Sequence, residues 1–161
     1  GTGSGAIIVT LLAELPEASG VASDASEAAL GVATVNAETH GVLGRLTLVR
    51  ADWFDGIEGQ FDFIVSNPPY IASAEIAELR ADVRDFDPPG ALDGGVDGLQ
   101  AYRRIAAGAL GYLTPKGHVV VEIGAGQERD VRPLFEAAGL VLAGRAFDLG
   151  GHVRCLAFRL P

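Results

Sequence analysis

The chain has 161 residues, of which 48% are apolar and 20% charged, a composition that excludes wholesale disorder and can fill the core of one domain. We find no apolar run of about 18 residues that could span a membrane and no basic-then-apolar leader. The net charge of −9, with Lys116 as the one lysine, argues against tight binding to nucleic acid. That affinity comes from lysine and arginine displacing counterions from phosphates.

The single cysteine, Cys155, excludes an internal disulfide and favours a reducing compartment, so we expect a cytoplasmic protein. It lies in an apolar run, and we interpret it as a buried structural thiol rather than a nucleophile. His40, His118 and His152 show no ligand spacing, so no metal site is predicted.

Short strand-like runs alternate with helix-like runs, which indicates an α/β fold. The first predicted helix ends at Pro16 and carries apolar residues at helical spacing, namely Ile7, Ile8, Leu11, Leu12 and Leu15. The next predicted elements are a strand over 21–24, a helix over 26–40 capped by Gly41, and a strand over 46–49.

The second half of the chain is predicted to contain longer connections and a C-terminal pair of strands. Its predicted elements are a strand over 61–66, a helix over 99–113, a turn over 114–117, a strand over 118–123, a helix over 128–138 and an antiparallel hairpin of strands over 141–148 and 153–160. Residues 71–98 form a long polar connection, and a connection of that length in a compact domain is usually functional.

A glycine-rich segment opens the chain and consists of Gly1, Thr2, Gly3, Ser4 and Gly5. Such glycines let a backbone approach a ligand closely, and the helix that follows offers N–H groups and partial positive charge. Asp24 ends the next strand, where an acidic residue accepts hydrogen bonds from ribose hydroxyls in nucleotide folds. An ordinary turn and a dinucleotide site are the alternatives. The glycine spacing departs from G-x-G-x-x-G and favours S-adenosylmethionine.

Asp52 and Trp53 follow the strand over 46–49. An indole face can stack on a purine, and a carboxylate can accept a hydrogen bond from its exocyclic amine. The alternative, equally weighted, makes Trp53 a partly buried core aromatic and Asp52 a cap.

The most informative segment is the tetrapeptide Asn67, Pro68, Pro69 and Tyr70, which directly follows the strand over 61–66. Its two prolines stiffen the chain at the carboxyl end of a strand, where ligands bind in open α/β sheets. A planar, conjugated NH₂ is a poor nucleophile, and two acceptors must orient it toward a methyl donor. The Asn67 side-chain oxygen and the Pro68 carbonyl can do this, while the Tyr70 ring stacks on the flat group. A rigid turn without chemistry is the alternative.

In order and spacing, these segments resemble the HemK-type protein-(glutamine-N5) methyltransferases, which modify peptide-chain release factors. The resemblance extends over essentially the whole chain, through Phe54, Ser66, Ile71, Phe86, Asp87, Pro88, Ala91, Leu92, Gly94, Gly95, Asp97, Gly98, Leu99, Tyr102, Arg103, Gly117, Glu122, Ile123, Gly124, Gln127, Asp148, Leu149 and Arg154.

The resemblance implies a class I S-adenosylmethionine-dependent methyltransferase fold, Rossmann-like, with a mostly parallel sheet and an antiparallel C-terminal hairpin. It implies a release factor as protein substrate, methylated on the glutamine of its Gly-Gly-Gln loop. The donor-binding residues it implies are Gly1, Thr2, Gly3, Ser4, Gly5, Asp24, Asp52, Trp53 and Asn67. The residues it implies for the glutamine amide are Asn67, Pro68, Pro69 and Tyr70, of which Asn67, Pro68 and Tyr70 are catalytic.

The resemblance also sets expectations for the domains. Residues 1–161 would be the catalytic domain, with 71–98 as a substrate-side insertion. The family's first strand and its N-terminal helical substrate-recognition domain are expected to be missing, so that the sheet lacks its central strand and the donor binds weakly.

Two other functions stay open. An adenine-N6 methyltransferase acting on DNA or RNA uses a near-identical tetrapeptide, but the acidic balance and the single lysine disfavour it. A non-catalytic donor-binding subunit would not need Asn67 and Tyr70. The acidic residues of 71–98 are interpreted mainly as a solvated face, with a docking surface for a basic partner as the alternative.

Overall fold

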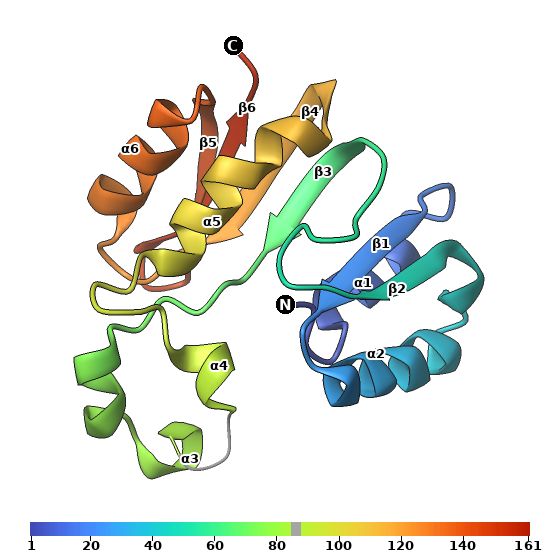
Figure 1. Ribbon diagram of the computed structural model, residues 1–161, viewed down its shortest axis with the longest axis horizontal. Helices are drawn as coiled ribbons and strands as arrows, with labels where there is room; N and C mark the ends of the chain where they lie inside the picture. Colours follow the sequence, from blue (N-terminus) through green and yellow to red (C-terminus); the bar gives the residue numbers. More distant parts are fainter. Residues whose placement is uncertain (85–87) are drawn as a thin grey trace. The chain divides into compact units, whose positions relative to one another are not determined.

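The computed structural model describes residues 1–84 and 88–161. Phe86 and Asp87, which contribute to the resemblance, and the neighbouring acidic residue Asp85 lie outside the described residues. The chain divides into two compact units, unit 1 (Gly1–Glu58) and unit 2 (Gly59–Pro161), each described by itself (Figure 1).

Unit 1 pairs two parallel strands with two helices. Its elements are α1 (Ala6–Glu14), β1 (Gly20–Asp24), α2 (Glu27–Thr39), the short 3₁₀ helix η1 (Leu43–Arg45) and β2 (Leu46–Arg50). Gly20 lies opposite Leu46, and Asp24 opposite Arg50. The core of unit 1 consists of Val9, Leu12, Ala22, Ala37, Val42 and Leu46. The predicted order of elements in this unit is confirmed, with ends shifted by a residue or two.

Local sequence signals fix the ends of α2. Ser26 precedes it, and its hydroxyl accepts a hydrogen bond from the Ala29 N–H at 3.2 Å, satisfying one of the helix's free donors. Gly41 follows with a φ of 68°, the left-handed conformation that commonly ends helices. The end of α1 depends on a distant residue instead. The Arg45 guanidinium donates to the carbonyl oxygens of Leu12, Leu15 and Ala18.

The apolar residues of α1 divide between core and surface. Leu12 is buried, whereas Ile7 and Leu11 are 45% and 37% exposed. Because two strands and α2 cover only one side of this helix within unit 1, the apolar stripe is wider than the surface available to bury it.

Unit 2 contains one four-stranded sheet. Its strands are β3 (Phe61–Ser66), β4 (Leu113–Glu122), β5 (Val141–Phe147) and β6 (Val153–Arg159). They lie in the order β3-β4-β6-β5; β3 and β4 are parallel, and β6 is antiparallel to both of its neighbours. The predicted C-terminal hairpin at the sheet edge is therefore confirmed, and within the described residues the strands of the two units form separate sheets.

Two helices pack on this sheet, α5 (Gln100–Ala109) and α6 (Glu128–Ala137) (Figure 1). Tyr102 of α5 and Phe135 of α6 are fully buried. Phe135 stacks on Phe158 of β6, with ring centroids 4.3 Å apart. Burial of this kind is the main source of stability in such a domain. The edge of the sheet that carries the ends of β3 and β4 is therefore supported by a packed core.

Two predictions about the helix–strand boundary after α5 are wrong. The predicted helix over 99–113 ends at Ala109; a 3₁₀ turn, η3 (Leu110–Tyr112), follows, and Leu113 already belongs to β4. The predicted turn at 114–117 is an irregularity inside β4, because Phe61 pairs with Leu113 but Phe63 pairs with His118. Thr114 still reaches β3, through a hydrogen bond from its hydroxyl to Asp62 at 2.9 Å. A strand can absorb such extra residues as a bulge.

The long connection after β3 contains local structure that the sequence did not reveal. It holds η2 (Ser73–Glu78), α3 (Ala81–Arg84) and α4 (Pro89–Leu92). These pieces have four to six residues each, too short for a hydrophobic period to be recognised.

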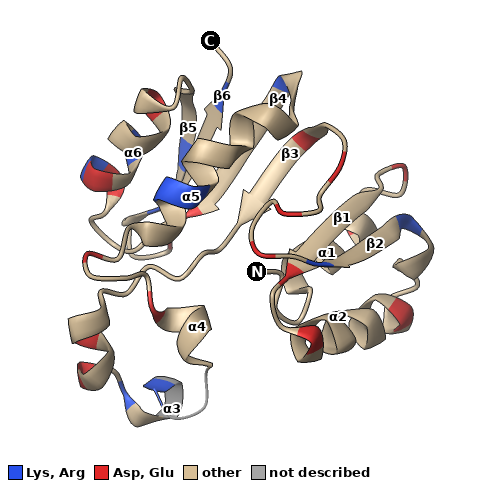
Figure 2. Cartoon of the chain, in the orientation of Figure 1, with Lys and Arg blue, Asp and Glu red and all other residues tan. Residues whose placement is uncertain are grey.

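Charges are dispersed over the ribbon in both units (Figure 2). Among the described residues, the basic side chains are scattered along both units and do not follow one another in a stripe. No helix among those residues has both the length and the apolar character needed to cross a bilayer.

Candidate active site

Asp24 organises the glycine segment of unit 1. One carboxylate oxygen accepts a hydrogen bond from the Gly3 N–H at 2.8 Å, and the other accepts one from the Ser26 N–H, also at 2.8 Å. The Thr2 N–H donates to the carbonyl of Ser23, the residue before Asp24. The structure therefore brings together the glycine segment and the acidic residue that the sequence singled out. Each carboxylate oxygen keeps a second lone pair for a ligand hydroxyl.

The glycine segment itself requires residues without a side chain. Gly3 and Gly5 have φ values of 55° and 77°, a region that other residues rarely adopt. A Cβ added to Gly5 would lie 3.0 Å from the Cβ of Ala33 on α2. Asn36, also on α2, donates from its side-chain amide to the Ser4 carbonyl at 2.9 Å. The second helix thus holds the segment in shape, a role for Asn36 that the sequence did not indicate.

Trp53 has an unusual backbone conformation. Its φ is 59°, and among the described residues it is the one non-glycine residue with positive φ. This conformation is costly for a bulky side chain, and such strain concentrates at ligand sites. Trp53 is half-buried and its neighbour Asp52 is exposed, which agrees both with a face that stacks on a ligand and with a partly buried core aromatic.

The tetrapeptide that follows β3 forms a corner of unit 2. Pro68 is buried, Pro69 and Tyr70 are half-buried, and Asn67 is exposed. Its position follows from the strand order. Because β3 and β4 are parallel, the residues after both strands emerge at the same edge of the sheet. That edge is the usual ligand side of an open α/β sheet.

Three glycines pack against this corner and leave no room for a side chain. A Cβ on Gly94 would come within 2.9 Å of the Pro69 carbonyl oxygen, and one on Gly98 within 2.5 Å of the Tyr70 carbonyl oxygen. A Cβ on Gly124 would lie 3.2 Å from the Tyr70 ring. Residues from the long connection and from the end of β4 therefore enclose the same two residues, Pro69 and Tyr70.

Tyr70 also has two polar partners. The Gln127 side-chain amide donates to the Tyr70 carbonyl at 3.0 Å and accepts from the Gly124 N–H at 2.8 Å. The Arg154 guanidinium donates to the Tyr70 hydroxyl at 3.1 Å and lies 5.6 Å from the ring centroid. A carboxylate oxygen of Glu122 lies 3.5 Å from the same guanidinium. In the sequence, Gln127 and Arg154 belong only to the positions that resemble the family. No sequence pattern indicates that either residue contacts Tyr70.

The Tyr102 hydroxyl and the Cys155 thiol lie close to this site, and their raised pKa values make both groups poorly reactive. The Tyr102 hydroxyl donates to the Glu122 carbonyl at 2.9 Å, and burial raises the pKa of this hydroxyl. Cys155 is half-buried rather than buried as predicted; it lies on the interior strand β6, opposite Glu122 of β4 and Ala146 of β5. Partial burial, and then the charge of Glu122, raise the pKa of its thiol, which lowers its reactivity.

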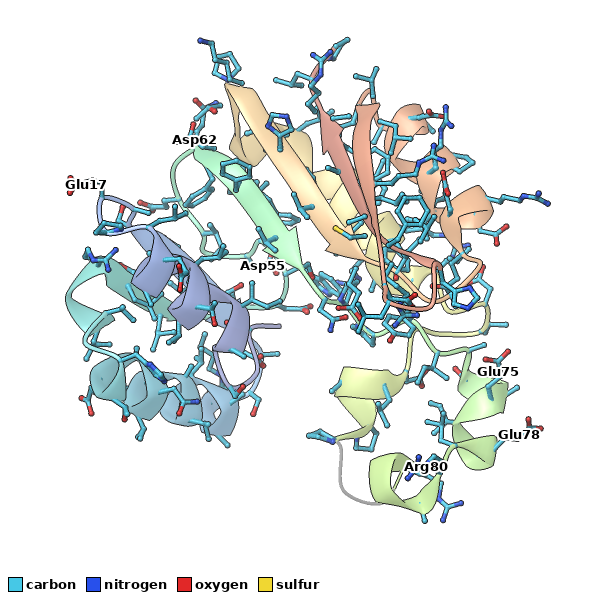
Figure 3. All side chains as sticks on the ribbon, turned by 180° about the vertical axis from the view of Figure 1, so that it is seen from behind. Glu17, Asp55, Asp62, Glu75, Glu78 and Arg80 are labelled. Atoms are coloured by element: carbon cyan, nitrogen blue, oxygen red, sulfur yellow. The ribbon has the colours of Figure 1, made fainter. Side chains whose placement is uncertain are left out.

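The acidic residues of the long connection fall into two groups. Asp93 accepts from the Ser73 hydroxyl at 2.7 Å and the Gly95 N–H at 2.9 Å, which lowers its pKa. The side chain of Asp97 forms a bidentate ion pair with Arg103 on α5. Glu75 and Glu78 are exposed and point outward from η2 (Figure 3), as expected for a solvated face.

Solved structures place this architecture in a known class. The ribosomal protein L11 methylase of Lactobacillus delbrueckii subsp. bulgaricus superposes with a TM-score of 0.72 at 19% identity, over 100% of this chain and 67% of that one. The chain therefore has the class I methyltransferase fold that the sequence predicted. The profile of the family described as methyltransferase small domain matches residues 1–83, and the chain belongs to that family.

Curated relatives are closer in sequence. The chain is 52% identical over 161 residues to the release factor glutamine methyltransferase of Cereibacter sphaeroides, and 48% identical over 159 residues to that of Agrobacterium fabrum. The aligned regions take in 100% and 99% of this chain. The chain spans somewhat more than half the length of these relatives, 58% and 55%.

Proposed function

We propose that this chain transfers a methyl group from S-adenosylmethionine to the side-chain amide nitrogen of a glutamine in peptide-chain release factors. The observation that carries the proposal is the 52% identity along the whole chain to a release factor glutamine methyltransferase. The glutamine of a Gly-Gly-Gln loop is the proposed target.

Unit 1 fits the methyl donor. Gly3 and Gly5 adopt positive φ and bring bare backbone to the start of α1, and Asp24 retains acceptor capacity. We propose that these residues hold the donor, together with Gly1, Thr2, Ser4 and the pair Asp52 and Trp53. The donor would supply a methyl group activated by its bond to a positively charged sulfur.

Unit 2 supplies what a glutamine amide requires. The amide nitrogen is a poor nucleophile because its lone pair is delocalised into the carbonyl. We propose that the side-chain oxygen of the exposed Asn67 and the Pro68 carbonyl oxygen accept hydrogen bonds from its two N–H groups and so orient the nitrogen. The Tyr70 ring would cover the flat amide and exclude water. The gain comes from positioning and electrostatics, and no covalent intermediate with the protein forms.

We propose that residues 1–161 act as the catalytic domain and that 71–98 lie on the substrate side of it. Support comes from the contacts of Gly94 and Gly98 with the carbonyls of Pro69 and Tyr70, which join the connection to the corner. No general base is needed, since the nitrogen loses its proton readily to water once methylated.

The test is mass spectrometry of a purified release factor incubated with the chain and isotope-labelled S-adenosylmethionine. We expect a mass gain of one methyl on the glutamine-containing peptide. A release factor with that glutamine replaced by alanine is the control and should gain nothing. Absence of methylation on the intact factor, or methylation at another residue, would overturn the proposal.

A further inference from the structure

Tyr70 has partners from distant parts of unit 2 at both its backbone carbonyl and its side chain. It lies in the chain directly after two prolines, so its backbone direction is restricted, but its carbonyl and ring still need partners. Both receive one from elsewhere in unit 2, the carbonyl from Gln127 and the hydroxyl from Arg154. These two residues come 57 and 84 positions later in the chain.

Topology explains how they meet. Gln127 follows β4, which runs parallel to β3, so it emerges at the same edge of the sheet as Tyr70. Arg154 is the second residue of β6, which runs antiparallel to β4, so the start of β6 lies at this edge as well. The Ile123 N–H donates to the Arg154 carbonyl at 2.9 Å, which anchors that end of β6 beside the end of β4.

The contacts are directional. The Gln127 amide uses its NH₂ for the Tyr70 carbonyl and its oxygen for the Gly124 N–H, so its orientation is fixed from both sides. The Arg154 nitrogen that donates to the phenol oxygen also lies 3.5 Å from a carboxylate oxygen of Glu122, so an ion pair holds the guanidinium near the ring. The phenol oxygen lies on the long axis of the ring, so a hydrogen bond from the guanidinium to this oxygen fixes the direction in which the ring points. Half-buried charged hydrogen bonds of this kind are stronger than neutral ones.

We infer that Gln127 and Arg154 are positioning residues that hold Tyr70 in the orientation the amide site uses. Arg154 acts through the hydroxyl, and Gln127 acts through the backbone carbonyl. The consequence for turnover rests on the proposed function, because it requires Tyr70 to cover a glutamine amide. The consequence for the Tyr70 ring does not depend on the substrate.

The first experiment monitors the environment of the Tyr70 ring by NMR. The chain is labelled with ¹³C-tyrosine, and the Tyr70 signal is assigned by its loss in Tyr70→Phe. We expect Arg154→Gln to move or broaden this signal. The control Arg159→Gln removes an exposed arginine from the same strand and should leave it in place. An unchanged Tyr70 signal in folded Arg154→Gln would overturn the inference, whether or not the chain methylates a release factor.

The second experiment reads turnover on the release factor. Arg154→Gln should lower kcat by about 10- to 100-fold, since small misplacements of a positioning group cost that much, with the KM for S-adenosylmethionine changed less than about threefold. In the Tyr70→Phe background, Arg154→Gln should lower kcat by less than about threefold, because the hydroxyl to which Arg154 donates is already absent. Equal losses in both backgrounds would show that Arg154 does not act through the hydroxyl.

Gln127 is tested with a substitution of the same shape. Gln127→Glu keeps an acceptor for the Gly124 N–H but places an oxygen against the Tyr70 carbonyl. We expect a displaced Tyr70 signal and a loss of kcat similar to that of Arg154→Gln. Gln60→Ala, which removes an exposed carboxamide from the same unit, is the control. Wild-type kcat and an unmoved ring signal in Gln127→Glu would refute the assignment of Gln127.

Discussion

At the scale of single residues, the corner after β3 combines one exposed side chain with a rigid surround. Asn67 is exposed while Pro68 is buried, so the carboxamide is available to a ligand on backbone that cannot easily move. The enclosing glycines and polar partners act on Tyr70 and Pro69, not on Asn67. This division suits a group whose task is to accept hydrogen bonds from a substrate rather than to hold the fold.

Asn67→Ala should therefore remove turnover and spare the fold. We expect at least a 100-fold loss of methyl transfer, the scale seen when one preorganised hydrogen-bonding group is deleted. The melting temperature and the calorimetric Kd for S-adenosylmethionine should change little. Gln60→Ala is the matched control, an exposed carboxamide just before β3. Retained activity in Asn67→Ala would refute the amide-holding role.

The ion pair between Asp97 and Arg103 predicts a pH dependence of stability. The hydrogen bond from Arg103 lowers the pKa of Asp97 from 3.8 to about 2. A lowered pKa stabilises the fold above the ordinary value, and that stabilisation is lost as pH falls through about 2. The difference in thermal midpoint between wild type and Asp97→Asn should be full near pH 5 and disappear towards pH 2.

Thermal melts across that range test this prediction, with Glu75→Gln as the control for removing an exposed carboxylate from the same connection. Because both partners of this ion pair are exposed to solvent, the effect should be small and weakened by salt. A midpoint difference that stays constant down to pH 2 would argue that the pair does not form in solution.

At the scale of elements, the contact between the glycine segment and α2 leaves little room for change. Gly5 combines positive φ with a neighbour that a methyl group would crowd, the Cβ of Ala33 at 3.0 Å. Gly5→Ala should lower the free energy of unfolding by at least about 1 kcal/mol. It should also weaken donor binding, because the segment must shift.

Gly31→Ala is the matched control, since Gly31 lies within α2 and an added Cβ would meet nothing within 4 Å. Alanine is the better helix former, so this change should stabilise by about 0.5–1 kcal/mol. Chemical denaturation of both variants provides the comparison. Equal effects of the two substitutions would mean that the close approach to Ala33 is not maintained.

At the scale of the whole molecule, the net charge distinguishes between the two functions proposed for the tetrapeptide, methylation of a protein glutamine and methylation of adenine in nucleic acid. A net charge of −9 leaves little to attract a polyphosphate backbone. We expect duplex DNA and duplex RNA to bind with a Kd weaker than about 100 μM near physiological salt. Fluorescence anisotropy with labelled duplexes measures this, beside a basic DNA-binding domain as a positive control. Low-micromolar binding that weakens steeply with added salt would revive the nucleic-acid alternative.

The sequence by itself determined the order of the longer helices and strands of both units and the C-terminal hairpin, and it singled out the glycine segment, Asp24 and the tetrapeptide as candidate site residues. These follow from local rules, since helical spacing, caps such as Ser26, and proline at Pro68 act within a few residues. It placed a turn at 114–117 because Pro115 and Gly117 are strong local signals. Pairing with β3 overrides them, and the segment stays within β4.

Only the tertiary structure decided which distant residues meet. Arg45 caps α1, Asn36 holds the Ser4 carbonyl, and Arg154 donates to the hydroxyl of Tyr70. Hydrogen bonds between side chains and groups tens of residues away have no periodic trace in a sequence. They depend on strand order and direction, which bring the ends of β3 and β4 and the start of β6 to one edge of the sheet.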